Sequence, residues 1–232
     1  MTLRTANPHA LNGAQLKAIA MVTMLIDHMA VVFLEQLYPY VVDMAVFDTQ
    51  TIVYITMRLI GRLAFPIFAY LLVVGFYHTK NIKKYAFRLG VFALISELPF
   101  DYAMLGRWNW GYQNIFFTLL IGLLMLYLVD NGQSRWLKGL YFLLACAVAH
   151  FLQVDYGFFG VIVIGMMALV RHNPNGYTVP TAVILLYQFT APLALIPIRQ
   201  YDGTRGRQNK WLMYAFYPVH LAVLYLIART VL

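Results

Sequence analysis

Residues 16–33 read LKAIAMVTMLIDHMAVVF, and this stretch decides the fold. It is almost entirely apolar and long enough to cross a bilayer, because about 20 predominantly apolar residues span the hydrocarbon core as a helix. Apolar and polar side chains do not alternate along it, so it lacks the period-two pattern of a transmembrane β-strand. The sequence therefore predicts a transmembrane helix here, and similar apolar runs follow along the chain.

The composition of the whole chain agrees with a membrane protein. Of the 232 residues, 62% are apolar and 11% are charged, whereas a soluble domain is about half apolar and about a quarter charged. These values exclude an ordinary soluble domain and a disordered chain. The net charge is +8, but most basic residues lie in short segments between apolar runs, as in multispan proteins. We therefore expect a lipid bilayer as partner, and no nucleic acid.

The apolar runs predict an all-α, polytopic transmembrane bundle of about eight spans, within a range of about seven to ten. We expect the spans at Leu16–Tyr38, Ile52–His78, Tyr85–Leu105, Ile115–Val129, Trp136–Leu152, Gly157–Val170, Val179–Ile198 and Trp211–Val231. Residues 1–15 form a short polar N-terminal segment, and residues 16–232 form a single transmembrane domain.

Basic segments between the spans predict the orientation of the chain, since Lys and Arg collect on the cytoplasmic side. Residues 78–88, HTKNIKKYAFR, are expected there, and with eight spans both termini are cytoplasmic. The loop RQYDGTRGRQNK, residues 199–210, disagrees, because it is basic and yet strict alternation places it outside. Either one span is re-entrant or split, for which Pro192 and Pro197 make the seventh a candidate, or the loop breaks the rule.

Two ionisable residues, Asp27 and His28, stand in the middle of the first span. A charge at mid-bilayer costs on the order of 2.5–3.5 kcal/mol on insertion scales, so each needs a partner or a function. A histidine can exchange a proton near neutral pH, and a carboxylate can orient its ring. Glu35 lies seven residues after His28, on the same stripe of the helix. We interpret Asp27 and His28 as catalytic candidates, with a helix-locking hydrogen bond as the alternative.

A second intramembrane histidine, His220, lies in the last span, just after Tyr217 and Pro218. Two such histidines in different helices of so apolar a chain indicate a function, so His220 is the third catalytic candidate. The sequence does not decide which histidine acts as the base. No Cys or His grouping has the spacing of a zinc site, so no metal is expected.

Arginines at the start of the second apolar segment predict anion binding. Arg58 and Arg62 are four residues apart on one helix face, and two guanidinium groups on one face suit a phosphate or a carboxylate. Snorkelling toward the membrane interface is the alternative. Arg205 and Arg207, in the basic loop described above, are further candidates for phosphate binding if that loop is cytoplasmic.

Three other polar residues are candidates for binding a substrate. Glu97 precedes a Leu-Pro step, where the proline frees a backbone carbonyl and polar groups can gather; a buried hydrogen bond is its alternative role. Asn114 begins the fourth span, where a helix cap is the alternative role. Tyr156 lies in a short external segment, where membership of an interfacial aromatic belt is the alternative.

Several segments, in order, resemble the TraX family. They are residues 16–33, GRLAFPIFAYLLVVGF, the basic HTKN loop, ALISELPFD, NIFFTLLIG, DYGFFG and FYPVHLAVLYL. The resemblance covers nearly the whole chain from about Leu16, and no single segment carries it. This family is associated with N-terminal acetylation of conjugative pilin in the bacterial inner membrane. It also resembles a wider group of integral-membrane acyltransferases, which includes the acyltransferase-3 proteins and the heparan-α-glucosaminide N-acetyltransferases.

The resemblance implies a multi-pass protein of the bacterial plasma membrane that moves an acetyl group from cytoplasmic acetyl-CoA to an amine or hydroxyl acceptor. The acceptor would be a pilin-like peptide or a cell-envelope glycan, and the sequence names neither. In this interpretation His28, oriented by Asp27, is the general base or acyl relay. Arg62, with Arg58, binds a CoA phosphate or polarises the thioester, and His220 lines the acceptor side or is itself the base.

The rival hypothesis is a proton-coupled small-solute transporter or channel. Intramembrane Asp, His and Glu residues also serve proton relays. The lack of a detectable internal repeat argues mildly against a transporter. Binding of acetyl-CoA separates the two classes of protein.

Overall fold

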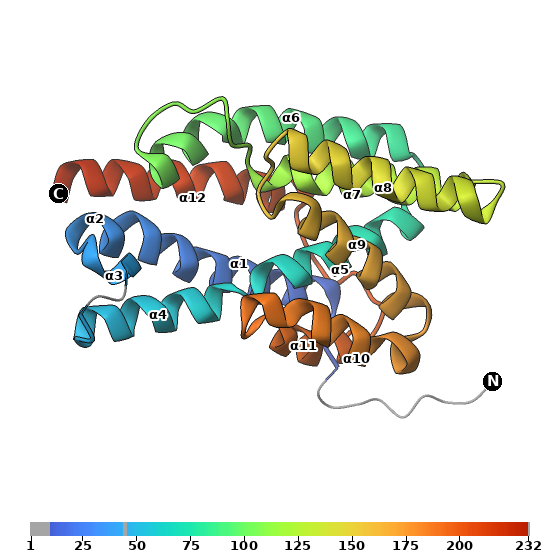
Figure 1. The fold of residues 1–232 in the computed structure, drawn as a ribbon, viewed down its shortest axis with the longest axis horizontal. Helices are drawn as coiled ribbons and strands as arrows, with labels where there is room; N and C mark the ends of the chain where they lie inside the picture. Colours follow the sequence, from blue (N-terminus) through green and yellow to red (C-terminus); the bar gives the residue numbers. More distant parts are fainter. Residues whose placement is uncertain (1–9, 44–45, 232) are drawn as a thin grey trace.

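The computed structural model describes residues 10–43 and 46–231, which are almost entirely helical (Figure 1). In this part of the chain the only β-type pairings are two isolated parallel bridges, Leu11 with Tyr201 and Gln113 with Val154. The predicted all-α fold class is therefore confirmed. Of the predicted polar N-terminal segment, residues 1–9 lie outside the described residues.

Helices form at each of the predicted spans. They are α1 (Gly13–Met29), α2 (Glu35–Leu37), α3 (Tyr40–Asp43), α4 (Thr49–Gly61), α5 (Ala64–His78), α6 (Ile82–Phe100), α7 (Ile115–Asn131), α8 (Arg135–Phe151), α9 (Gly157–His172), α10 (Pro174–Leu185), α11 (Leu195–Arg199) and α12 (Lys210–Val231). Within the described residues, three helical stretches are long and apolar enough to cross a membrane: Gly13–Leu37, Thr49–His78 and Trp211–Val231. The apolar helices α7 and α9 are shorter.

The outside of the bundle exposes large apolar side chains. Phe87 and Leu94 of α6 are 72% and 71% exposed, and Leu143 and Trp136 of α8 are 65% and 90% exposed. Such a surface is an aggregation hazard in water, but it is expected where lipid covers the protein. Together with the long apolar helices, it makes this chain a membrane protein.

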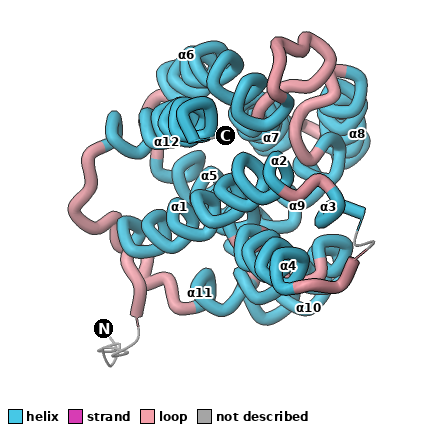
Figure 2. Tube along the Cα trace, turned by 90° about the vertical axis from the view of Figure 1, so that its left-hand side faces the viewer, coloured by secondary structure: helices cyan, strands magenta, loops and turns pink. Residues whose placement is uncertain are grey.

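Helix α5 lies at the centre of the bundle, with α1, α7, α9 and α11 packed against it (Figure 2). Its side chains Ile67 and Val73 are completely buried. Residue 61 controls the approach of α4 to α1, because a Cβ atom on Gly61 would lie 2.3 Å from the Asp27 side chain. Small residues at such contacts are typical of helix packing in membranes.

The second apolar segment is broken at Arg62 and Leu63 into α4 and α5. Pro66 explains the break, because a proline ring clashes with the carbonyl group four residues earlier, here that of Arg62, and has no N–H to donate. The last turn of α4, just before the break, packs against α1 at Asp27.

The seventh predicted span, Val179–Ile198, is not one continuous helix. Helix α10 passes into a short 3₁₀ turn and then into Phe189, whose φ of 52° lies in the left-handed region. The chain continues as a second 3₁₀ turn and α11, both packed against α10. Pro192 and Pro197 stand in these short pieces and limit their length. The segment is therefore re-entrant, the first of the two explanations that the sequence allowed.

The re-entrant segment returns the basic loop to the end of the bundle where α1 begins. Leu11 donates its N–H to Gln200 at 2.8 Å and accepts from Asp202 at 2.9 Å, and Gly13 donates to Thr204 at 2.8 Å. The basic loop therefore lies at the same end of the bundle as the start of α1. In Figure 1, α12 ends on the side of the bundle where α1 ends, away from the start of α1.

Candidate active site

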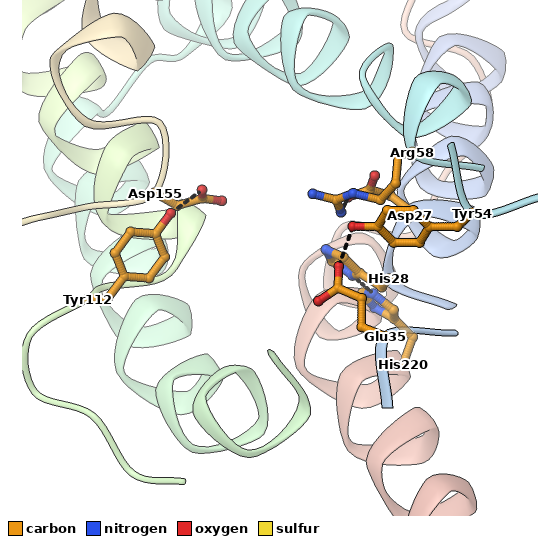
Figure 3. A network of polar contacts seen from close by, with 8 residues as sticks. All are labelled: Asp27, His28, Glu35, Tyr54, Arg58, Tyr112, Asp155 and His220. Atoms are coloured by element: carbon orange, nitrogen blue, oxygen red, sulfur yellow. Dashed lines mark hydrogen bonds and ion pairs between the residues drawn. The ribbon is translucent and has the colours of Figure 1, made fainter. Parts of the chain in front are cut away.

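The two intramembrane histidines meet inside the bundle. His28 of α1 and His220 of α12 have parallel rings, with an interplanar angle of 1° and centroids 4.9 Å apart. The Nδ1 atom of His28 lies 2.6 Å from Nε2 of His220, and the Nδ1 atom of His220 lies 2.7 Å from the carbonyl oxygen of Phe216. Residues 192 positions apart in sequence thus form one hydrogen-bonded pair, which Figure 3 shows.

The hydrogen bonds assign the proton positions in this pair. A carbonyl oxygen can only accept, so Nδ1 of His220 carries a proton and donates it to Phe216. In neutral His220 the other nitrogen, Nε2, is then the acceptor, and Nδ1 of His28 is the donor. The lone pair of His28 is left on its Nε2 atom. Because His28 lines the central cavity, this nitrogen is the one that can take a proton from a bound molecule.

Asp27 and Glu35 have partners other than His28. A carboxylate oxygen of Asp27 accepts from Arg58 at 2.8 Å, and Glu35 accepts from the hydroxyl group of Tyr54 at 2.6 Å. The orientation of His28 by Asp27, expected from sequence, is therefore wrong. Adjacent helical positions point about 100° apart, so Asp27 faces α4 while His28 faces α12.

Arg62 lies at the break between α4 and α5. Its positive charge acts on the carboxylates of Asp27 and Asp155. Arg58 is already bound to Asp27. Both arginines therefore lie beside acidic groups deep in the bundle, far from the first turn of α1.

The opposite wall of the site comes from the segment between α8 and α9. There Asp155 accepts a hydrogen bond from the hydroxyl group of Tyr112 at 2.9 Å. Figure 3 shows this pair on the side of the site opposite the Asp27–Arg58 pair. Burial raises the pKa of Asp155 to about 6, against the effects of the Tyr112 hydrogen bond and the Arg62 charge. Asp155 can thus change its protonation state near neutral pH.

Tyr156 is held in an unusual conformation beside this wall. Its φ is 64°, in the left-handed region, and its ring stacks on Phe65 with centroids 4.0 Å apart. The hydroxyl group of Thr118 donates to the carbonyl group of Asp155, which fixes the preceding peptide. Strained non-glycine residues of this kind cluster at functional sites. Tyr156 also lines the central cavity.

One cavity of about 450 Å³ connects these groups with the end of the bundle where α1 begins. Its deep part is lined by Asp27, His28, Asp155, Tyr156 and Tyr217, and its other end by Lys17, His78, Arg88, Tyr201, Arg205 and Gln208. We call the second group the basic mouth. Apolar side chains such as Met24 and Phe68 line the passage between the two ends.

The basic mouth contains only part of the cation set expected from sequence. Arg205 lines it, whereas Arg207, in the same loop, does not. Lys17 and Arg88 line it and were missed in the sequence, because cations near helix ends are common as interfacial anchors. The sequence placed Asp155 beside Tyr156 in the same external segment but gave it no role, because an acidic residue in a loop is ordinarily solvated.

Asn114 and Glu97 lie outside the cavity lining. Asn114 caps α7 by accepting from the N–H of Phe116 at 3.0 Å, and its amide nitrogen donates to Ala93 at 2.8 Å and to Glu97. Both residues therefore join α6 to the start of α7. Their position favours a helix cap for Asn114 and a buried hydrogen bond for Glu97 over contact with a substrate.

Comparisons with known proteins support the family resemblance of the sequence. The family model described as TraX protein matches residues 12–228. A probable fimbrial assembly protein FimC, serogroup H1, from Dichelobacter nodosus is 29% identical over 245 residues, which cover 90% of this chain and 93% of that protein. No solved structure matches the chain. Because the family model covers nearly all of the helical bundle, this chain belongs to the TraX protein family.

Proposed function

We propose that this protein is an integral-membrane acyltransferase that moves an acetyl group from acetyl-CoA to an amine or hydroxyl acceptor. One observation carries the proposal: a single cavity joins a cationic mouth to a histidine with a free ring nitrogen. From Lys17 to His28 the helix rises about 16 Å, at ~1.5 Å per residue. This distance is comparable to the length of an extended pantetheine arm.

In the proposed reaction, Nε2 of His28 takes the proton of the acceptor as general base. The acceptor nitrogen or oxygen then forms a bond to the thioester carbonyl carbon, and the carbon–sulfur bond breaks when the intermediate collapses. His28 returns the proton to the leaving CoA thiolate. His220 acts as a positioning residue, because it accepts from Nδ1 of His28 and so stabilises the protonated ring.

We assign two donors for the developing oxyanion. Arg58 does not itself line the cavity, but it is bound to Asp27, which does, and it points toward the side of Asp155 in Figure 3. Tyr156 lines the cavity and carries a hydroxyl group. Donors fixed in advance by other contacts stabilise an oxyanion most effectively, because they need no reorganisation during the reaction.

The proposal also includes an acceptor and a location. The printed name of the Dichelobacter nodosus relative refers to fimbrial assembly, which supports a pilin-like peptide over a cell-envelope glycan. We place the protein in the bacterial inner membrane with the basic mouth in the cytoplasm. The mouth adjoins the basic segment after α5, and such segments stay on the cytoplasmic side.

The test uses the purified full-length chain in detergent or nanodiscs. Binding of CoA is measured first, and transfer of label from acetyl-CoA to membrane proteins and glycans is measured second. Wild-type protein should bind CoA and transfer label, whereas His28→Ala should bind CoA without transfer. If wild-type protein binds no CoA, the acyltransferase proposal is wrong, and proton uptake by proteoliposomes would then support a transporter.

A further inference from the structure

The basic mouth holds three cationic side chains that come from three separate parts of the chain. Lys17 is in the second turn of α1, Arg88 is in the second turn of α6, and Arg205 is in the loop before α12. All three line one end of one cavity, together with Gln208. Because these segments are far apart in the sequence, the tertiary fold brings the three cations together.

The backbone fixes Arg205 at this place. Its loop is bound to the residues before α1 by the Leu11–Tyr201 bridge and by the hydrogen bond from Gly13 to Thr204. Gly206 follows with a φ of 66°, and a Cβ atom there would lie 2.4 Å from Asn12. The loop therefore passes close to the α1 N-terminus, and only glycine fits at position 206.

The cations of the mouth are left without acidic partners in the described residues. Lys17 donates to the neutral side chain of Gln208 at 2.6 Å. Arg88 lies over the ring of Tyr85, and its buried Nε atom has no hydrogen-bond partner there. The ion pair found in the described part of the chain joins Arg58 to Asp27, in the deep part. Buried donors without partners carry a large free-energy cost unless a ligand satisfies them.

We infer that Lys17, Arg88 and Arg205 form a binding site for the phosphate groups of a nucleotide, and that the acyl donor must carry this nucleotide. The inference rests on the proposed function and deepens it. Three cations match the several phosphate charges of CoA better than the single phosphodiester of a carrier-protein pantetheine. The site replaces Arg58, Arg62 and Arg207 as the place where the donor phosphates bind.

The experiment uses adenosine 3′,5′-bisphosphate, which has the phosphates of a CoA nucleotide but no thioester. Its binding to the full-length chain is measured by calorimetry, beside CoA and uncharged adenosine. Wild-type protein should bind the bisphosphate and CoA but not adenosine. Arg205→Ala and Lys17→Gln should each lower the affinity for the bisphosphate and for CoA by about tenfold to a hundredfold, because a charge-assisted hydrogen bond is lost.

Arg207→Ala is the matched control, because it removes the same charge from the same loop at a residue that does not line the cavity. It should change the affinity less than about twofold. Equal effects of Arg205→Ala and Arg207→Ala would overturn the inference, and so would equal binding of the bisphosphate and adenosine. The protein is also reconstituted in phosphatidylcholine vesicles and in phosphatidylglycerol vesicles. If the mouth binds phosphatidylglycerol, and no nucleotide binds in phosphatidylcholine vesicles, the mouth is a site for a lipid headgroup and the inference is wrong.

The outcomes also separate this inference from the proposed function. If acetyl transfer occurs while the mouth variants bind the bisphosphate normally, the phosphate site is wrong and the acyltransferase proposal stands. If the bisphosphate binds at the mouth but acetyl-CoA yields no transfer with any membrane acceptor, the phosphate site stands and the acyltransferase proposal is wrong.

Discussion

The two ends of the cavity differ in how their polar groups are satisfied. In the deep part, the ionisable side chains Asp27, His28 and Asp155 each have a partner: His28 has His220, Asp27 has Arg58 and Asp155 has Tyr112. At the basic mouth, the cations have neutral partners or none within the described residues. The deep part is therefore organised before any ligand arrives, and the mouth is organised to receive one.

This difference suggests that the deep part of the cavity carries out the reaction and that the basic mouth binds the ligand. Groups that are fixed in advance can stabilise charge as it develops in a reaction. Cations without protein partners contribute mainly to affinity for an anion. Substitutions at the two ends should therefore change different kinetic parameters, and the predictions below test that separation.

The largest effect is expected for His28→Ala. Removing the general base should lower the rate of acetyl transfer by about 10²–10⁴-fold, while affinity for CoA stays within about twofold. Label transfer and calorimetry measure the two quantities on the same preparation. His172→Ala, at the exposed end of α9, is the control. A His28→Ala protein with normal transfer would show that the histidine pair is structural.

The next effect concerns the positioning role of His220. His220→Phe removes the acceptor for the His28 proton and should lower kcat by roughly a hundredfold, as expected when a reacting group is misplaced. The KM for acetyl-CoA should not change. His220→Gln offers an amide oxygen as acceptor and should recover part of the rate. Equal rates for the Phe and Gln variants would contradict the tautomer assignment.

The sequence predicted which residues matter in the deep part better than how they pair. Asp27, His28 and His220 could be identified because a polar group inside an apolar run is conspicuous. Their partners could not be, since the pairing of His28 with His220 rather than Asp27 depends on how α12 and α4 are rotated against α1. No apolar pattern specifies that rotation when lipid and protein interior are both apolar.

The basic mouth was harder to predict from sequence. The loop at residues 199–210 was recognised as anomalous, and two prolines pointed to a broken span. Its attachment to Leu11 and Gly13 uses backbone hydrogen bonds, which leave no side-chain signature. Lys17 and Arg88 resemble ordinary interfacial cations, so only the fold shows that they share a cavity with Arg205.

A third prediction concerns Asp155 and the pH dependence of stability. Its folded pKa of about 6 is above the ordinary value of 3.8, so the folded protein prefers the protonated form. Stability should be greatest below about pH 4 and should fall by about 3 kcal/mol as pH rises through 6. Asp155→Asn should remove this slope, as measured by thermal unfolding from pH 4 to 7.

Asp202, in the loop that carries Arg205, has a pKa shift of the opposite sign. Hydrogen bonds from Thr204 lower the pKa of Asp202, so any stability that it contributes is present at neutral pH and is lost as pH falls. Asp202→Asn should therefore leave the loss between pH 4 and 6 intact. If Asp155→Asn keeps the wild-type slope, the carboxyl group is not buried as the structure places it.

The smallest effect is expected for Asn114, which the sequence assigned to substrate binding and the structure places at the start of α7. Asn114→Ala should lower stability by about 1–2 kcal/mol through loss of the cap. Asn114→Ser, which can still cap, should lose less. Because Asn114 does not line the cavity, neither variant should change the KM for acetyl-CoA or for the acceptor. A raised acceptor KM in Asn114→Ser, with normal thermal stability, would extend the deep part of the site to α7 and restore a substrate contact for this residue.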